Sequence, residues 1–304
     1  TFLTANLAVK IARIGDMGQV TLAADIDGKG LRFETVDARL IGNIQSLGFK
    51  NYAYSNIKVN GEIAKKLFNG KVNVQDPNLD LDFEGKINFQ GKLPIFDFTA
   101  AIKRAHLDPL NLVNISGDNY ISTTINSRLT GNNLDNLTGE VRIDNTNFQV
   151  DQKLYRVNRI FLNSTWLDQE ERDLFLESDF LDARMSGRFQ LAQLGDAAKQ
   201  WLPRYLPSVI LPMKTDPGIQ DFTFTIRVKN TSFLTETFLP SWTIDPNTRL
   251  SGKMNTMDKT VLLKLSSPDL TYGAVGIHGL QTVMSSDVAN LRLDVSADSL
   301  FLGA

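Results

Sequence analysis

Few residues of this chain could carry out acid–base, nucleophilic or metal chemistry. Cysteine is absent, which removes disulfides, thiolate metal ligands and thiol nucleophiles together. The two histidines, His106 and His278, have no second histidine or glutamate nearby at metal-ligand spacing. No Gly-x-Ser-x-Gly motif is present to expose a nucleophilic serine. The sequence therefore predicts no catalytic residues, no metal site and no cofactor, and it favours a non-enzymatic protein.

An acidic run near residue 80 could attract calcium, because hard cations bind several carboxylate oxygens in a tight loop. The run consists of Asp76, Asp80, Asp82 and Glu84. The last three alternate with apolar residues, so we expect them on one face of an extended strand, where their carboxylates do not converge. This spacing favours a solvated strand face over a calcium site.

Charge and length narrow the class of protein. The 32 basic and 34 acidic residues give a net charge of -2, so no nucleic-acid partner is predicted. No stretch of this 304-residue chain resembles a linker, and we expect residues 1–304 to form a single elongated segment. The first residues match neither a start methionine nor a signal peptide, and no stretch has the roughly 18 apolar residues of a membrane span. We therefore expect a piece of a larger protein.

Alternation of apolar and polar residues dominates the sequence, and it is typical of strands with one dry and one wet face. In residues 79–84 every second residue is apolar and every residue between is acidic. The pattern recurs along the chain and predicts an all-β fold, an antiparallel meander. The apolar positions expected on the inward face are Val72, Val74, Leu79, Leu81, Phe83, Ile87, Phe89, Phe96, Phe98, Ile102, Val141, Ile143, Phe148, Val150, Phe222, Phe224, Ile226, Val228, Leu291, Leu293 and Val295.

Short segments rich in glycine, asparagine and proline separate the strand-like runs and predict hairpin turns, because these residues tolerate the backbone angles that turns require. The predicted turns are Asn60-Gly61, Asn69-Gly70, Asp76-Pro77-Asn78, Gly131-Asn132-Asn133 and Ser251-Gly252.

Two segments have a helical pattern. An apolar stripe that begins at Leu191 predicts a helix within residues 191–206, and a second is expected over residues 232–239, with Ser232 as its cap. Short helices of this kind most often cover a sheet edge or an open apolar face.

Several segments resemble the TamB family, the large anchored subunit of the translocation and assembly module, in its versions from Bacteroidetes-type bacteria. This family belongs to the AsmA-like group of repeating β-groove proteins. Degenerate strand repeats over roughly residues 20–300 carry the similarity, and no catalytic signature contributes to it. The segments are Tyr52–Gly61, Phe68–Val72, Asp76–Gly85, Ala105–Leu107 with Leu110–Leu112, Leu134–Gly139, Arg172–Leu174 with Glu177–Asp179, and Met185–Phe189.

The resemblance implies a long curled sheet with a hydrophobic interior. Such a protein is anchored in the inner membrane and reaches through the periplasm toward an outer-membrane barrel protein of the Omp85 type. Family members are implicated in moving phospholipid between membranes and in outer-membrane protein assembly. The inward apolar positions that match the family's alternation, such as Leu81 and Phe83, would then line a lipid groove. The chain lacks the family's N-terminal anchor and a recognisable docking end.

Three functions remain open on this evidence. Phospholipid acyl chains could lie along the apolar face, a free sheet edge could pair with nascent outer-membrane strands, or side chains could fill a structural β-solenoid. About 18–20 strands at a spacing of ~4.8 Å would make a sheet on the order of 90 Å long. Two short helices cannot cover so long an apolar face, which favours the lipid groove.

Overall fold

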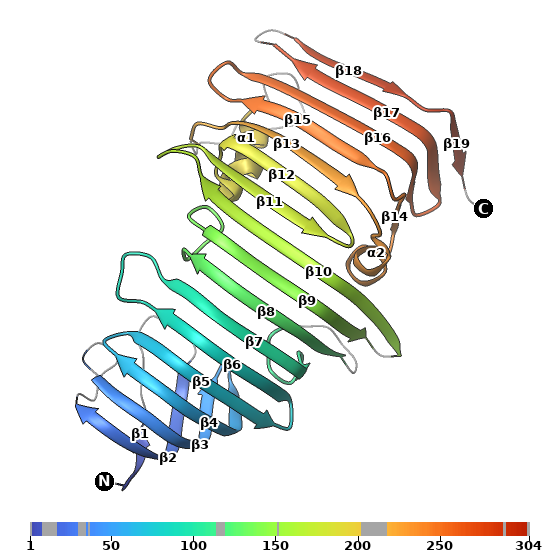
Figure 1. The fold of residues 1–304 in the computed structure, drawn as a ribbon. Helices are drawn as coiled ribbons and strands as arrows, with labels where there is room; N and C mark the ends of the chain where they lie inside the picture. The colour runs from blue at the N-terminus through green and yellow to red at the C-terminus, as the bar shows by residue number, and fades with distance from the viewer. Residues whose placement is uncertain are drawn as a thin grey trace. The chain divides into compact units, whose positions relative to one another are not determined.

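The computed structural model describes residues 2–7, 17–29, 35, 37–113, 119–150, 152–201, 218–287 and 290–302 (Figure 1). Most of these residues lie in strands, which confirms the all-β prediction. The strands are β1 (Phe2–Leu7), β2 (Met17–Lys29), β3 (Asp37–Phe49), β4 (Tyr52–Ala64), β5 (Leu67–Asp76), β6 (Leu79–Asn88), β7 (Ile95–His106), β8 (Asn119–Thr130), β9 (Thr138–Val150), β10 (Lys153–Trp166), β11 (Arg172–Ser178), β12 (Leu181–Arg188), β13 (Asp221–Val228), β14 (Trp242–Ile244), β15 (Arg249–Asn255), β16 (Thr260–Tyr272), β17 (Val275–Ser286), β18 (Leu291–Ser296) and β19 (Ser299–Leu302).

Contacts between Cα atoms divide the chain into two compact units. Unit 1 comprises Thr1–Asn132 and Glu140–Arg159, and unit 2 comprises Asn133–Gly139 and Ile160–Ala304. In unit 1 each strand from β1 to β7 pairs antiparallel with the next. In unit 2 the antiparallel ladder runs from β10 to β13, on to β15, and then to β18. The predicted antiparallel meander is confirmed within each unit.

Two short strands of unit 2 extend neighbouring strands end to end. β14 pairs with the end of β16, from Leu270 to Tyr272, whereas β15 pairs with the first part of β16. β19 pairs with the start of β17, and β18 pairs with its end. The β16–β17 hairpin therefore has a short strand on either side of its turn.

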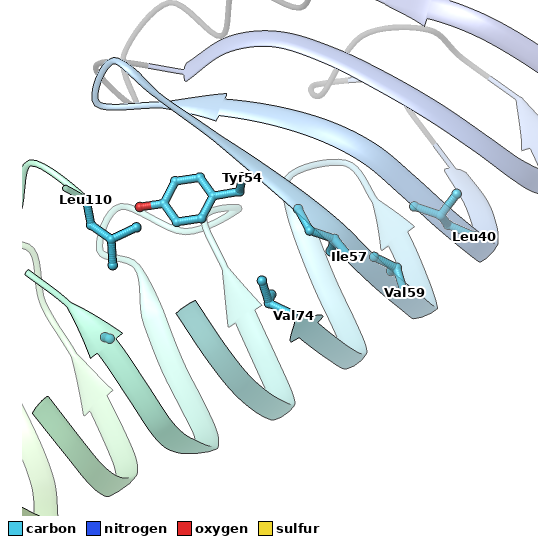
Figure 2. Close-up of a cluster of buried hydrophobic side chains, with 7 residues drawn as sticks. Leu40, Tyr54, Ile57, Val59, Val74 and Leu110 are labelled. Atoms are coloured by element: carbon cyan, nitrogen blue, oxygen red, sulfur yellow. The ribbon is translucent and has the colours of Figure 1, made fainter. Parts of the chain in front are cut away.

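The core of unit 1 lies on one face of β3–β7 (Figure 2). Alternate residues of β4, such as Ile57 and Val59, are buried there beside Val74 of β5. Leu110, from the turn after β7, is completely buried against the same cluster. Side chains at every second position therefore build this core, as period-two alternation requires.

Two asparagines with positive φ lie where the apolar residues of a strand change between odd and even positions. Asn56 has φ 51°, and the ladder between β3 and β4 passes over it without a change of register, so that Tyr54 and Ile57 share the core face. Asn145 has φ 54° within β9, where the apolar positions change from odd to even numbers. These positive φ angles are typical of β-bulges. The backbone at these two residues thus returns the apolar side chains to one face.

Three of the five predicted turns are wrong, because their glycines lie inside strands. Asn60-Gly61, Asn69-Gly70 and Ser251-Gly252 belong to β4, β5 and β15. The β4–β5 turn consists instead of Lys65 and Lys66, both with positive φ. The turn at Pro77-Asn78 and the connection that begins at Gly131 are confirmed.

Glycine is required at these strand positions because neighbouring backbones and rings come close. Gly61 faces Gly70, which in turn faces Gly85 of β6. A Cβ atom at Gly61 would lie 3.0 Å from the ring of Phe68, so the ring covers the space that a side chain would fill. Such pairing of glycine with a neighbouring aromatic ring stabilises sheets.

The helices occur near the predicted segments. A 3₁₀ turn (η1, Leu191–Gln193) leads into α1 (Leu194–Trp201), and residues 202–206 of the prediction lie outside the described residues. The second helix, α2, spans Ser232–Phe238. Ser232 is not its cap: Thr231 occupies the cap position, and its hydroxyl binds the Ile244 carbonyl oxygen instead of the helix backbone. The predicted serine cap is therefore wrong.

Gly70→Ala should destabilise unit 1 by about 2 kcal/mol, because overpacking typically costs 1–3 kcal/mol. The new methyl would lie 2.5 Å from the Asn60 carbonyl oxygen. Gly91→Ala is the control in the same unit, since its nearest neighbour would be 3.3 Å away. Urea unfolding measures both variants, and equal midpoints would contradict the close approach of the strands.

Asp76 should make unit 1 sensitive to acid. Burial raises the pKa of Asp76, but hydrogen bonds from Tyr52, Asn78 and Ser55 outweigh it and lower the pKa below the ordinary 3.8. A depressed carboxyl pKa stabilises the fold above the unfolded value, and this stability is lost as pH falls through the folded pKa. When the pH is lowered from about 5, Asp76→Asn should therefore lose less free energy of unfolding than the unaltered chain. Urea unfolding at each pH measures this difference. An unchanged pH profile would contradict this role.

Candidate functional site

The predicted inward positions of unit 1 share one face, and neighbouring strands bring them into register. Val72 lies opposite Phe83, Val74 opposite Leu81, and Ile87 opposite Phe96. Rings add further contacts along this face: the centroids of Phe83 and Phe98 are 5.1 Å apart, and those of Phe89 and Phe96 are 5.9 Å apart. Apart from Val74 and Phe148, the predicted positions of unit 1 are half-buried.

Part of this face is filled by the protein itself. Val74 belongs to the buried cluster that Leu110 covers. Val72, Leu79, Leu81 and Ile102 pack against the cluster from its border. Protein side chains therefore already occupy the apolar face at this end of unit 1.

The opposite face of unit 1 is polar, and its charges pair with one another. Lys103 Nζ lies 2.8 Å from Asp82 and 3.5 Å from Asp80, while Lys71 lies 2.9 Å from Glu84. The hydrogen bond from Lys103 is the main cause of the lowered pKa of Asp82. Within the described ranges no group of three histidine or acidic side chains could hold a metal ion. Asp80, Asp82 and Glu84 thus form a cation-paired polar strand face, whereas Asp76 is buried.

A hollow of about 630 Å³ also lies on this polar face, and sequence reasoning missed it. Thr99, Asn126 and Arg128 are among its lining residues. Arg128 approaches Glu140 to 3.7 Å across neighbouring strands, and Thr99 donates a hydrogen bond to Asn126. The polar groups of the hollow therefore satisfy one another in part.

Unit 2 carries a continuous apolar face, which we call the trough. Its residues stand opposite one another across successive strands, and all are apolar except Thr282. One row consists of Leu174, Met185, Phe224, Gly252, Leu263, Met284 and Leu293, and the adjacent row consists of Leu176, Ala183, Ile226, Leu250, Leu265, Thr282 and Val295.

The predicted positions of unit 2 all lie on the trough face. Phe222 at one border is buried, whereas Leu293 and Val295 on β18 are 59% and 60% exposed. Val228 and Leu291 are half-buried. Exposure therefore rises toward β18, where the apolar face lies open to a ligand.

Sequence reasoning missed several members of the trough. Leu174 with Leu176, and Leu263 with Leu265, repeat the same apolar-x-apolar signal that identified the other strands. Gly252 was misassigned to a turn, although the Phe224 ring covers it. The alternation could have found the leucines, but not the role of the glycine.

A buried arginine closes one end of the trough, and nothing in the alternation indicated it. Arg172 is completely buried and donates a 2.7 Å hydrogen bond to the Leu134 carbonyl oxygen. Its guanidinium lies 4.4 Å from the centroid of Phe189 and 5.4 Å from that of Trp166. Burial lowers the pKa of Arg172, and Asp135 opposes that shift.

Asp135 connects this arginine to the helical segment. It lies 3.4 Å from Arg172 and accepts backbone hydrogen bonds from Leu191 and Ala192 at the start of η1. Loop 133–137 and η1 are thereby held together at the end of the trough. We call this arrangement the arginine clamp.

Among the described residues neither histidine belongs to a group of three metal-ligating side chains. His278 forms an ion pair with Asp269 and stacks on Phe301 at a centroid distance of 4.9 Å. His106 lies on β7, with its ring 5.9 Å from that of Tyr120. These are contacts between neighbouring strands.

Comparison with known proteins shows no match to a protein-family model, a curated protein or a solved structure. Among the helices of the described residues, none has the length and apolar character needed to cross a membrane.

Arg172→Met should destabilise unit 2 by about 3 kcal/mol, because removing one partner of a buried charged pair typically costs 3–5 kcal/mol. Arg184→Met is the matched control on the neighbouring strand. Arg184 is exposed and pairs with Asp173 at 2.7 Å, so its loss should cost less than about 1 kcal/mol. Chemical unfolding of both variants measures the difference, and equal losses would show that the clamp adds nothing to stability.

Proposed function

We propose that this chain is part of a lipid-transfer protein of the bacterial envelope, in which phospholipid acyl chains lie along the trough of unit 2. The observation that carries the proposal is the cross-strand register of apolar residues from Leu174 to Leu293, in which the ring of Phe224 covers Gly252. The opposite face is polar and includes the paired Arg184 and Asp173. One face thus suits hydrocarbon and the other suits water.

The register also suits movement of a lipid along the trough. Contact with an apolar surface offsets the loss of bilayer contacts at roughly 0.8 kcal/mol for each methylene group. Successive strands offer similar apolar contacts, so an acyl chain that shifts by one strand loses and gains contacts of similar free energy. Lipid headgroups would remain in water at the open side, near the exposed Leu293 and Val295.

The resemblance to the TamB family supplies the cellular setting of the proposal. A periplasmic location, an inner-membrane anchor and an outer-membrane barrel partner of the Omp85 type would place the trough between two membranes. Phospholipid is the proposed cargo, and no cofactor or catalytic residue is part of the proposal.

A free strand edge favours a second candidate function, chaperoning by strand addition. Within the described residues β18 pairs with β17 alone, so its other edge can accept a strand. A client strand would extend the sheet there, and its apolar side chains would continue the trough face. The partly filled face of unit 1 suits a structural role as well.

Lipid content of the purified chain tests the trough. The chain is expressed in a bacterium, whose membranes supply phospholipid, and purified. Native mass spectrometry of the purified chain should then detect bound phospholipid. Met284→Asp should lower the bound amount about tenfold, because it places a charge on the apolar face. Ser285→Asp, the next residue on the opposite face, should leave it unchanged.

Crosslinking separates lipid transfer from strand addition. A photoreactive phenylalanine analogue at Leu293 should capture phospholipid, and the same analogue at Asp294 on the opposite face should not. Protein adducts at both positions, with equal lipid content in the two aspartate variants, would favour strand addition and overturn the lipid proposal.

A further inference from the structure

Strand β18 of unit 2 carries exposed apolar side chains on one face and one charge of each sign on the other (Figure 1). Leu293 and Val295 are 59% and 60% exposed on the trough face. On the opposite face, the side chains of Arg292 and Asp294 are 76% and 54% exposed. Among the described residues only β17 pairs with this strand, so its outer edge offers unpaired backbone groups.

The neighbouring strand offers no partner for these two charges. On β17, Ser285 lies opposite Arg292, and Val283 lies opposite Asp294. Arg292 and Asp294 bind each other along their own strand instead, where Nε and Oδ2 are 2.7 Å apart. A guanidinium and a carboxylate can each make several hydrogen bonds, so both groups can bind a further partner beyond the open edge.

The order of residues in β18 is self-complementary in an antiparallel pair. Residues 291–295 are in turn apolar, basic, apolar, acidic and apolar. When two such strands pair about a two-fold axis at Leu293, Arg292 of each copy lies opposite Asp294 of the other. Leu293 then meets its own counterpart and Leu291 meets Val295, all on the trough face.

Neighbouring registers lack this match. A shift of one residue places apolar side chains of one copy opposite charged side chains of the other. A shift of two places Arg292 opposite Arg292 or Asp294 opposite Asp294, and like charges directly opposite destabilise a strand pair. Only the register centred on Leu293 brings the opposite charges together and keeps both apolar faces on the same side.

We propose that two copies of this chain form a two-fold dimer in which their β18 strands pair antiparallel about Leu293. Edge strands that avoid association often carry charges that repel a second strand, whereas the charges of β18 match those of its own copy. Pairing also covers Leu293 and Val295 and joins the open ends of two troughs. A standard interface uses about 20–30 residues on each side, so this smaller contact should give a weak, concentration-dependent dimer.

This dimer stands apart from the proposed lipid transfer, because the strands pair without lipid in the trough. It uses the edge to which a client strand would add, so a second copy and a client would compete for it.

Two cysteine variants locate the axis, because the chain has no cysteine of its own. In the proposed register the two copies of Leu293→Cys lie about 4.5–5.5 Å apart between Cα atoms, which permits a disulfide. Val295→Cys is the control, since Val295 has the same face and nearly the same exposure. Its two copies lie about 13 Å apart along the strands, which is too far for a disulfide.

Oxidation should therefore link Leu293→Cys into covalent dimers and leave Val295→Cys monomeric, as measured by non-reducing gel electrophoresis. Equal linking of the two variants would overturn the register, because collisions between equally exposed cysteines would then explain both.

Charge reversal tests what holds the copies together. Arg292→Asp and Asp294→Arg each place like charges opposite each other, so each should raise the dissociation constant about tenfold in sedimentation equilibrium. An equal mixture of the two variants restores both ion pairs between copies and should associate as the unaltered chain does. Lys253→Asp, an exposed charge reversal on the interior strand β15, should leave the dissociation constant unchanged.

The mixture separates a contact between copies from an effect within one strand, because neither variant regains the ion pair along its own strand. A chain that stays monomeric at every concentration would overturn the proposal, as would single variants that dimerise as well as the unaltered chain. Native mass spectrometry measures copy number and bound phospholipid separately, so failure of the dimer and failure of lipid carriage are distinguishable.

Discussion

Cross-strand register is the constraint on which the rest of this structure depends. A strand presents alternate side chains to opposite faces, so a slip of one residue would turn every apolar side chain toward water. The ladder between β3 and β4 holds one register, and Asn56 and Asn145 have positive φ angles where the apolar pattern changes between odd and even positions. Both the unit 1 core and the unit 2 trough follow from this alignment, since each consists of side chains from many strands.

Close approach between strands gives this alignment its local specificity. Gly61, Gly70 and Gly85 follow one another across three strands, and the ring of Phe68 occupies the space above Gly61. Phe224 over Gly252 repeats the arrangement in unit 2. A ring fits over a glycine only where the two residues are in register, so each such pair favours one alignment over its neighbours.

The two units share the same alternating strand pattern, but their apolar faces differ in how far protein side chains cover them. In unit 1 Leu110 and its neighbours fill part of the apolar face, whereas in unit 2 the face opens toward β18. The arginine clamp closes the other end of the trough with a buried charge that is fully surrounded by protein. Beyond Ser267 the apolar residues of β16 change from odd to even numbers, where Pro268 and Gly279 interrupt the β16–β17 ladder.

The sequence by itself determined the all-β antiparallel fold, the faces of most strands and the place of both helices, because alternation and helical periodicity are local properties. The tertiary structure alone decided what the glycines do and where charges are buried. Gly70 pairs with Gly61 instead of forming a turn, and Arg172 finds its partner 38 residues away at Leu134. These features arise from contacts between distant segments, and a period of two contains no information about which strand lies alongside.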